Sequence, residues 1–181
     1  SFTGCWFVRA LAEQGHAVTA TFTRGSVDAY EGVAQERVNA ACSRTTAVWD
    51  ARFGNDNMLS ALAAAPFDLL CLHGAQVGNH KATDFLVSEA LTANTHRLDE
   101  VLLAAKHAGV KAVLATGSYF EADTGAGHEP REAFSPYALS KALTWQAQRF
   151  ACAQAGLPLA KFVVANPFGP LEKGGFTSYL A

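Results

Sequence analysis

The chain of 181 residues is long enough for one domain with a sizeable buried core, and half of its residues are apolar. Its net charge of −2 excludes a broad basic surface for nucleic acid or anionic membrane. No apolar stretch approaches the length of a membrane span and no basic-then-apolar leader is visible, so we expect a cytoplasmic protein that acts on small molecules.

The first half of the chain alternates between helix-like and strand-like patterns. Residues 5–14 carry apolar side chains at helical spacing, and the β-branched run at 17–23 predicts the strand that follows. Residues 46–49 are a weaker strand candidate, and a short helix over 57–65 stops at a proline. The continuous apolar run at 67–72 predicts a strand that is buried on both faces.

The second half repeats this alternation with longer helices. We predict one long amphipathic helix over 84–107 and a buried strand over 110–115. Ser135 and Pro136 suit the N-cap and the first position of a second long helix, which runs through residue 155. One more strand is predicted at 160–165.

This order of strands and helices, without repeats or low-complexity tracts, indicates the fold class. It predicts an α/β protein with a Rossmann-like, doubly wound parallel sheet and helices on both of its faces. Because the chain opens on a helix, we expect the first strand of that sheet to be missing.

Tyr137 and Lys141 point most directly to chemistry. Four positions apart on a helix, they share one face, so the ammonium of Lys141 can approach the hydroxyl of Tyr137. A nearby cation favours the phenolate and lowers the pKa of a tyrosine from its ordinary value near ~10. The pair therefore predicts a general base that takes a proton from a hydroxyl as hydride leaves the same carbon. The alternative is a surface tyrosine and lysine on an amphipathic helix.

Thr116, Gly117 and Ser118 end the strand that precedes this helix. Ligands of doubly wound folds lie at that carboxyl edge of the sheet, where a small hydroxyl can hydrogen-bond a substrate oxygen. We therefore add Ser118 as a catalytic and substrate-binding candidate, the alternative being ordinary turn chemistry.

These features, together with the later segment NPFGP at 166–170, resemble the extended short-chain dehydrogenases/reductases, and within them the NAD-dependent epimerase/dehydratase family. The resemblance covers essentially the whole chain in the same order. It implies that residues 1–181 are an NAD(P)-binding Rossmann-like domain, incomplete at both ends and without the family's C-terminal substrate lobe. It also implies hydride transfer at a nucleotide-sugar hydroxyl, with Ser118, Tyr137 and Lys141 as catalytic residues. A homodimer that packs through the predicted helices at 84–107 and 137–155 is left open.

The first four residues, Ser-Phe-Thr-Gly, resemble the second half of the family's glycine-rich turn. That turn brings a dinucleotide pyrophosphate to the backbone at a helix N-terminus. The resemblance implies cofactor contacts for Phe2, Thr3 and Gly4, with Gly4 as the last glycine of the turn. Ser1 stands where the middle glycine usually lies, a departure that tightens the backbone approach.

The end of the next strand indicates which nicotinamide cofactor is used. NAD-preferring relatives carry an acidic residue there that holds the ribose hydroxyls. This chain has Phe22, Thr23 and Arg24 instead, and Arg24 can pair with a 2′-phosphate, so the residues favour NADP over NAD. The alternative is an exposed arginine. Asp50 and Ala51 resemble the family's adenine-contacting pair.

Two further segments resemble parts of the family that run beneath the cofactor or order its surroundings. Leu72, Gly74 and Ala75 match the segment beneath the cofactor, whereas His73 is shifted by one position from the usual histidine and is interpreted as structural. Asn94 matches an asparagine that orders the active-site backbone, and its alternative is a solvent-facing polar residue.

The remaining expected contacts lie at two strand ends. Asn166 and Pro167 resemble the turn that meets the nicotinamide edge and the nucleotide-sugar phosphates, which implies a substrate contact for Asn166 and a cofactor contact for Pro167. Thr116, at the end of the preceding strand, completes the expected cofactor-binding set.

The sequence therefore predicts an NAD(P)-dependent epimerase or oxidoreductase that acts on a nucleotide-sugar hydroxyl. Tyr119 and Phe120 stand where the family's dehydratases carry an Asp-Glu pair, and Glu121 is a poor substitute by position, so an epimerase is favoured over a dehydratase. Two alternatives stay open: an NADP-dependent carbonyl or ketone reductase, and a non-catalytic dinucleotide-binding protein. The four cysteines and six histidines show no ligand spacing, so we assign no metal.

Overall fold

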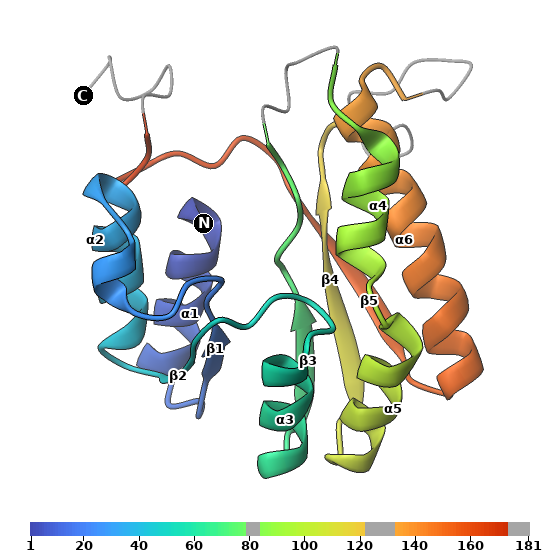
Figure 1. The fold of residues 1–181 in the computed structure, drawn as a ribbon, viewed down its shortest axis with the longest axis horizontal. Coiled ribbons are helices and arrows are strands. Elements are labelled where there is room, and N and C mark those ends of the chain that lie inside the picture. Colours follow the sequence, from blue (N-terminus) through green and yellow to red (C-terminus); the bar gives the residue numbers. More distant parts are fainter. Residues whose placement is uncertain (79–83, 122–132, 174–181) are drawn as a thin grey trace. The chain divides into compact units, whose positions relative to one another are not determined.

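The computed structural model describes residues 1–78, 84–121 and 133–173 (Figure 1). These residues form two compact units. The described residues of the first unit are Ser1–Arg52, Asp56–Met58 and 166–173, and those of the second lie within Phe53–Asn55 and Leu59–Ala165. Each unit combines helices with strands that pair in parallel, which confirms the predicted α/β class.

The first unit pairs two short strands with two helices and a single 3-10 turn. Its elements are α1 (Phe2–Glu13), β1 (Thr19–Thr21), η1 (Val27–Ala29), α2 (Gly32–Cys42) and β2 (Thr46–Val48). The two strands are parallel, with Thr19 opposite Thr46, and α1 packs on α2. β1 is shorter than the predicted strand over 17–23, whereas β2 agrees with its prediction to within one residue.

The helix α2 was not predicted. It buries only Val38 and Ala41, and no side chain caps its N-terminus at Glu31. A helix with so narrow an apolar face gives almost no periodic signal in the sequence, so its position could not be inferred.

The second unit contains a three-stranded parallel sheet in the order β3-β4-β5. Its elements are α3 (Asp56–Ala64), β3 (Leu69–Leu72), α4 (Val87–Thr95), α5 (Leu98–His107), β4 (Ala112–Ser118), α6 (Pro136–Ala155) and β5 (Leu159–Val164). The first residues of α3, Asp56–Met58, group with the first unit. The helices α4, α5 and α6 pack together beside the sheet (Figure 1). Its core consists of Leu72, Leu98, Leu102, Val113, Ala115, Ala151, Cys152 and Leu157.

The predicted single helix over 84–107 is wrong, because the chain breaks between α4 and α5. Arg97 adopts a left-handed conformation with φ 50°, and the carbonyl oxygen of His96 lies so close to Gly54 that a Cβ there would be 1.9 Å from it. The buried positions of the two helices still follow helical spacing across the break, at Ala90, Asn94 and Leu98. Periodicity alone therefore cannot reveal it.

The prediction that the strand at 67–72 is buried on both faces is also wrong. Along β3, Leu72 is buried and Leu70 is partly buried, whereas Leu69 and Cys71 on the opposite face are exposed. Both Leu70 and Leu72 pack with the core cluster of this unit. The apolar run therefore lies with only one of its faces against that core.

The predicted start and end of the second long helix are confirmed. The Ser135 side chain accepts a hydrogen bond from the N–H of Ala138, and Pro136 occupies the first helical position. Gly156 ends α6 with φ 68°, a conformation that costs glycine little. Within the described ranges, no helix has the length and apolarity that crossing a bilayer requires.

Candidate active site

The end of β4 positions the first hydroxyl residue of the candidate site. Ser118 is the last residue of β4 and pairs with Val164 of β5. Directly before it, a Cβ on Gly117 would lie 2.9 Å from Cδ of Lys161 and 3.3 Å from Oε1 of Glu121. Glycine at this position therefore lets two charged side chains pass close against the strand.

The start of α6 places Tyr137 and Lys141 one helical turn apart. The intervening face is anchored, since Ala138 and Ser140 are completely buried. The hydroxyl of Ser140 donates to the carbonyl oxygen of Tyr137 at 2.8 Å, and α6 packs against β4. The Ser135 cap and these buried small residues fix the register in which the phenol and the ammonium approach the strand.

Ser118 and Tyr137 meet in the structure. Their side chains share a hydrogen bond, and the Ser118 hydroxyl oxygen also accepts from the N–H of Phe120 at 3.2 Å. The ring of Phe85 contacts Tyr137 edge to face, with ring centroids 6.0 Å apart. The phenol is therefore held both at its oxygen and at its ring.

Lys141 reaches the same strand from α6. Its ammonium donates to the carbonyl oxygen of Thr116 at 2.8 Å. Burial lowers the pKa of Lys141, the negative charge of Glu121 raises it, and the positive charge of Lys161 lowers it. The two predicted catalytic side chains therefore both point toward the last residues of β4.

The expected lowering of the tyrosine pKa is not what the structure shows. Burial raises the pKa of Tyr137, its hydrogen bond with Ser118 lowers it, and the charge of Glu121 raises it further. Burial is the main cause, and the Lys141 ammonium is directed to the carbonyl oxygen of Thr116. At neutral pH Tyr137 is thus a neutral phenol.

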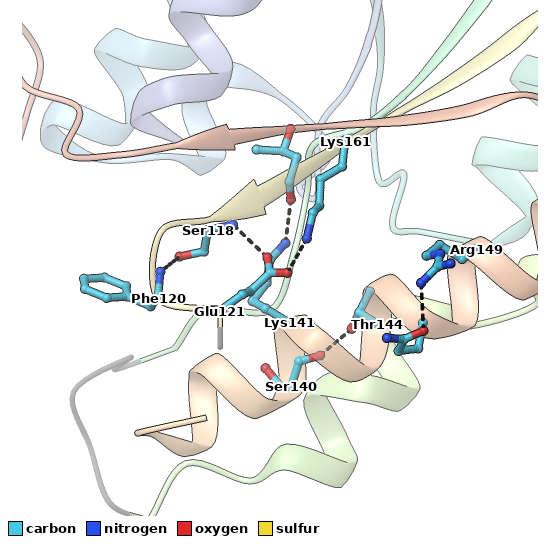
Figure 2. A network of polar contacts seen from close by, with 10 residues as sticks. Ser118, Phe120, Glu121, Ser140, Lys141, Thr144, Arg149 and Lys161 are labelled. Carbon is cyan, nitrogen blue, oxygen red and sulfur yellow. Dashed lines mark hydrogen bonds and ion pairs between the residues drawn. The ribbon is translucent and has the colours of Figure 1, made fainter. Parts of the chain in front are cut away.

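Glu121 is the buried carboxylate of this group of side chains, and sequence reasoning missed its burial. Its side chain is 1% exposed and forms an ion pair with Lys161 of β5, with 3.0 Å between Oε2 and Nζ. Its Oε1 accepts from the N–H of Ser118 at 2.7 Å (Figure 2). Nothing in the sequence near Glu121 distinguishes it from an exposed loop residue, because its partner lies 40 positions away.

His73 lies beside this group of side chains. Its Nδ1 is 2.9 Å from the hydroxyl of Thr116. Burial is the main cause that lowers its pKa to about 4, and positive charges, that of Lys141 among them, lower it further. His73 is therefore neutral at physiological pH, in keeping with the structural interpretation made from the sequence.

Asn94 of α4 orders backbone near the end of β3 instead of facing solvent. It is 6% exposed, and its side-chain oxygen accepts from the N–H of Gln76 at 2.7 Å. Its amide group donates to the hydroxyl of Thr144 on α6 at 3.4 Å. Of the two alternatives for Asn94, the structure agrees with the one in which it holds the backbone.

The segment after β3 contains the other cofactor contacts expected in this unit. Leu72 ends the strand in the core, whereas Gly74 and Ala75 follow it. A Cβ added at Gly74 would meet nothing within 4 Å, so the space beside this backbone is open.

In the first unit, Phe2, Thr3 and Gly4 lie in the first turn of α1. The N–H of Gly4 donates to the Ser1 hydroxyl at 3.0 Å. The helix N-terminus itself is therefore formed by the residues that resemble the family's glycine-rich turn.

Arg24 follows β1 and lies over the ring of Tyr30, 5.2 Å from its centroid, while its guanidinium donates to the carbonyl of Ala29.

Asp50, with φ 49°, directs its carboxylate at Gly25, where a Cβ would be 2.9 Å from Oδ2. Ala51 is buried and donates its N–H to the carbonyl of Phe22. All of these contacts lie within one unit.

Asn166 and Pro167 follow β5 and belong to the first unit. The chain that continues from them is tied to that unit by the side chains of Trp6 and Arg37. Trp6 donates to the carbonyl of Pro170 at 3.2 Å, and Arg37 donates to the carbonyl of Leu171 at 2.8 Å.

The residues present in each unit suit a nicotinamide dinucleotide. In the second unit, Tyr137 and Lys141 offer a phenol and an ammonium at the carboxyl end of β4, and the backbone at Gly74 is unobstructed. In the first, the N-terminus of α1 and the guanidinium of Arg24 are groups that attract phosphate.

Comparison with known proteins identifies relatives of this chain. The sequence profile of the NAD dependent epimerase/dehydratase family matches residues 1–181. No curated protein sequence matches it.

Solved structures of similar fold come from several enzymes. UDP-glucose 4-epimerase of Thermotoga maritima, solved with UDP-glucose, has a TM-score of 0.70 and 16% identity over 94% of this chain and 54% of its own. A dTDP-glucose 4,6-dehydratase of Streptomyces venezuelae, solved with NAD, has a TM-score of 0.68 and 22% identity over 95% and 55%. Vestitone reductase of alfalfa has a TM-score of 0.55 and 16% identity over 88% and 52%. The chain thus spans about half the length of the structures it matches.

Proposed function

This chain belongs to the NAD-dependent epimerase/dehydratase family, and from that premise we propose that it is the cofactor-binding part of an epimerase that acts on a hydroxyl of a nucleotide sugar. The observation that carries the proposal is the hydrogen bond between Ser118 and Tyr137, with the Lys141 ammonium one helical turn away at the same strand end. This arrangement gives the protein a proton donor and acceptor for an alcohol–ketone interconversion.

The roles of the three residues follow from their positions. Tyr137 takes the proton of the substrate hydroxyl at its phenolic oxygen and returns it when the alcohol forms again. Ser118 holds the same substrate oxygen by a hydrogen bond. The ammonium of Lys141, which donates to the carbonyl oxygen of Thr116 in this structure, would turn toward the phenol to stabilise a phenolate. A bound nicotinamide supplies the acceptor and donor of hydride. The reaction would be an epimerisation if the ketone rotated within the site, so that the hydride returned to the opposite face of its carbonyl carbon.

The cofactor proposal is NADP in preference to NAD. It is supported by the absence of a carboxylate among the residues that follow β1 at 22–24, and by the cation of Arg24 at that strand end. Arg24 would hold the 2′-phosphate in place of its present contact with the carbonyl of Ala29.

A dehydratase is less well supported than an epimerase. Elimination of water needs a carboxyl group that can exchange protons with the substrate. Tyr119 and Phe120 carry none, and both oxygens of Glu121 already accept contacts from Ser118 and Lys161.

A carbonyl reductase is the second candidate, and the raised pKa of Tyr137 favours it. A neutral phenol is the form that donates a proton to a carbonyl oxygen as hydride arrives at its carbon. The two candidates share Ser118, Tyr137 and Lys141 and differ in substrate.

The test compares full-length protein with its Tyr137→Phe variant. Turnover is measured with UDP-, GDP- and CDP-sugars and with simple ketones, and binding of NADPH is followed by its fluorescence. We expect Tyr137→Phe to abolish turnover and to leave cofactor binding unchanged. Tyr119→Phe, which removes the hydroxyl of a neighbouring tyrosine, is the matched control.

Each result has a distinct meaning. Turnover of nucleotide sugars supports the epimerase, and turnover of ketones alone supports the reductase. Undiminished turnover in Tyr137→Phe removes this residue from the mechanism, and cofactor binding without turnover of any substrate indicates the non-catalytic alternative.

The homodimer stays a prediction. Three large apolar side chains of α6 are exposed on the chain, namely Leu139, Leu143 and Phe150. Sedimentation of full-length protein over a range of concentrations measures its association state directly.

A further inference from the structure

A buried charge network lies at the end of β4 beyond the three residues used above. The carboxylate of Glu121 stands between the backbone of Ser118 and the ammonium of Lys161, and Lys141 lies alongside (Figure 2). The side chain of Glu121 is 1% exposed and that of Lys161 is 12% exposed. Charges are seldom buried to this degree unless they are paired and hydrogen-bonded.

The contacts of Glu121 shape the turn that carries the Ser118 hydroxyl. Its N–H donates to the carbonyl of Ser118 at 3.1 Å, and its Oε1 accepts from the N–H of Ser118 at 2.7 Å. The N–H of Phe120, inside the same turn, donates to the Ser118 hydroxyl at 3.2 Å. Glu121 therefore closes a four-residue turn onto the residue that touches Tyr137.

Lys161 holds the carboxylate from β5. Its ammonium lies 4.8 Å from the ring centroid of Trp145, so the cation is oriented by an aromatic face as well as by Glu121. The close passage of both side chains beside Gly117 leaves little freedom for the pair to move.

The same carboxylate acts on the charges of the candidate catalytic pair. Its negative charge raises the pKa of Tyr137 and raises that of Lys141, while Lys161 lowers that of Lys141. Glu121 thus favours a neutral phenol and a charged ammonium, which is the protonation state that a proton donor to a carbonyl needs.

We propose that Glu121 is a positioning residue of this site: through its contacts with Ser118 and Lys161 it fixes the turn that keeps the Ser118 hydroxyl on Tyr137. The proposal rests on the proposed function of Ser118, Tyr137 and Lys141. It assigns Glu121 no proton transfer with substrate, because both of its oxygens are engaged within the protein.

The test measures the ionisation of Tyr137 directly, without substrate or cofactor. Full-length protein labelled with ¹³C at the tyrosine Cζ is titrated by NMR, and Tyr137→Phe identifies the signal of Tyr137 among the four tyrosines. In Glu121→Gln the amide can still accept from Ser118 but carries no charge. Glu121→Ala removes the charge and also the acceptor of the Ser118 N–H, so the difference between the two variants reports on that contact alone. We expect Tyr137 to titrate at higher pH in Glu121→Ala than in Glu121→Gln, because the hydrogen bond with Ser118 that lowers its pKa is weakened.

Glu100→Gln is the matched control, since Glu100 also forms an ion pair, with Arg97 on the exposed surface of α5. It should leave the Tyr137 titration where it is in the unaltered protein. If these variants do not fold because Lys161 keeps a buried charge, Lys161→Met is added to each, and the same difference between the two should remain.

Coinciding Tyr137 titrations in Glu121→Gln and Glu121→Ala, with or without Lys161→Met, overturn the proposal. A role confined to stability would lower the melting temperature and leave this titration unchanged. Because turnover is not the readout, failure here is separate from failure of the proposed enzyme, which the Tyr137→Phe activity measurement decides.

Discussion

The Lys161 ammonium lies 3.0 Å from the Glu121 carboxylate, and both side chains are almost removed from water beneath the end of β4. An ion pair in this environment differs from the exposed pair between Lys111 and Asp68, whose side chains are 79% and 84% exposed. Exposed pairs contribute little to stability, whereas breaking a buried pair leaves a charge without compensation.

Lys161→Met should therefore destabilise the protein strongly. We expect a loss of about 3–5 kcal/mol in the free energy of unfolding, because Glu121 would stay buried without its cation. Adding Glu121→Gln to Lys161→Met should recover part of that loss, since no unpaired charge is left. Urea unfolding followed by circular dichroism measures both variants, with Lys111→Met as the control. A double variant less stable than Lys161→Met contradicts this account.

Gly117→Ala tests the close packing around the same pair. A methyl group at Gly117 would lie 2.9 Å from Cδ of Lys161, so the lysine or the strand has to shift. We expect a loss of about 1–3 kcal/mol, the usual cost of overpacking. Thermal unfolding measures it.

Gly74→Ala provides the comparison, because its added methyl group meets nothing within 4 Å. Its stability should stay within about 0.5 kcal/mol of the unaltered protein. If Gly74 lies beneath the cofactor, the same variant should bind NADPH more weakly. Equal destabilisation by the two glycine substitutions would show that the contact with Lys161 is unimportant.

His73 should make stability depend on pH between about 6.5 and 4. Its pKa is lowered to about 4 in the folded protein, so the unfolded chain binds its proton first as the pH falls. The stabilisation is complete at pH values above about 6.5, the pKa of histidine in the unfolded chain. It is lost as the pH falls toward the pKa of His73 in the folded protein, and the total loss is about 3 kcal/mol.

The measurement is the free energy of unfolding at a series of pH values for the protein and for His73→Gln. The variant should show a shallower loss of stability over this range. His107→Gln, at an exposed position of α5, should follow the unaltered protein. Parallel curves for all three proteins would mean that protonation of His73 is not coupled to unfolding.

The sequence indicated that Ser118, Tyr137 and Lys141 lie near one strand end because the signals for that arrangement are local. Tyr137 and Lys141 share a helical turn, and Ser135 and Pro136 mark where that turn begins, so their common direction follows from helix geometry. The strand that ends at Ser118 follows from its apolar run. The parallel direction of β3, β4 and β5 follows from the alternation of strands and helices along the chain.

What the sequence did not predict depends on contacts between distant residues. Glu121 becomes a buried ion only because Lys161 of β5 lies beneath it, and Arg97 leaves the helical conformation beside the close approach of His96 to Gly54. The pKa of Tyr137 likewise depends on where the Lys141 ammonium points, which spacing along a helix does not determine.

Arg24→Ala should change which nicotinamide cofactor is preferred. Arg24 stands at the end of β1, and its guanidinium can form charge-assisted hydrogen bonds with a 2′-phosphate. Such bonds contribute about 1.5–3 kcal/mol, so NADP binding should weaken about 10- to 100-fold while NAD binding changes little. Isothermal titration with NADP and NAD measures both constants. Arg44→Ala removes another exposed cation of the same unit and should leave the ratio of the two constants unchanged. A ratio in Arg24→Ala that equals that of Arg44→Ala would mean that Arg24 does not read the 2′-phosphate, and it would remove the basis for preferring NADP.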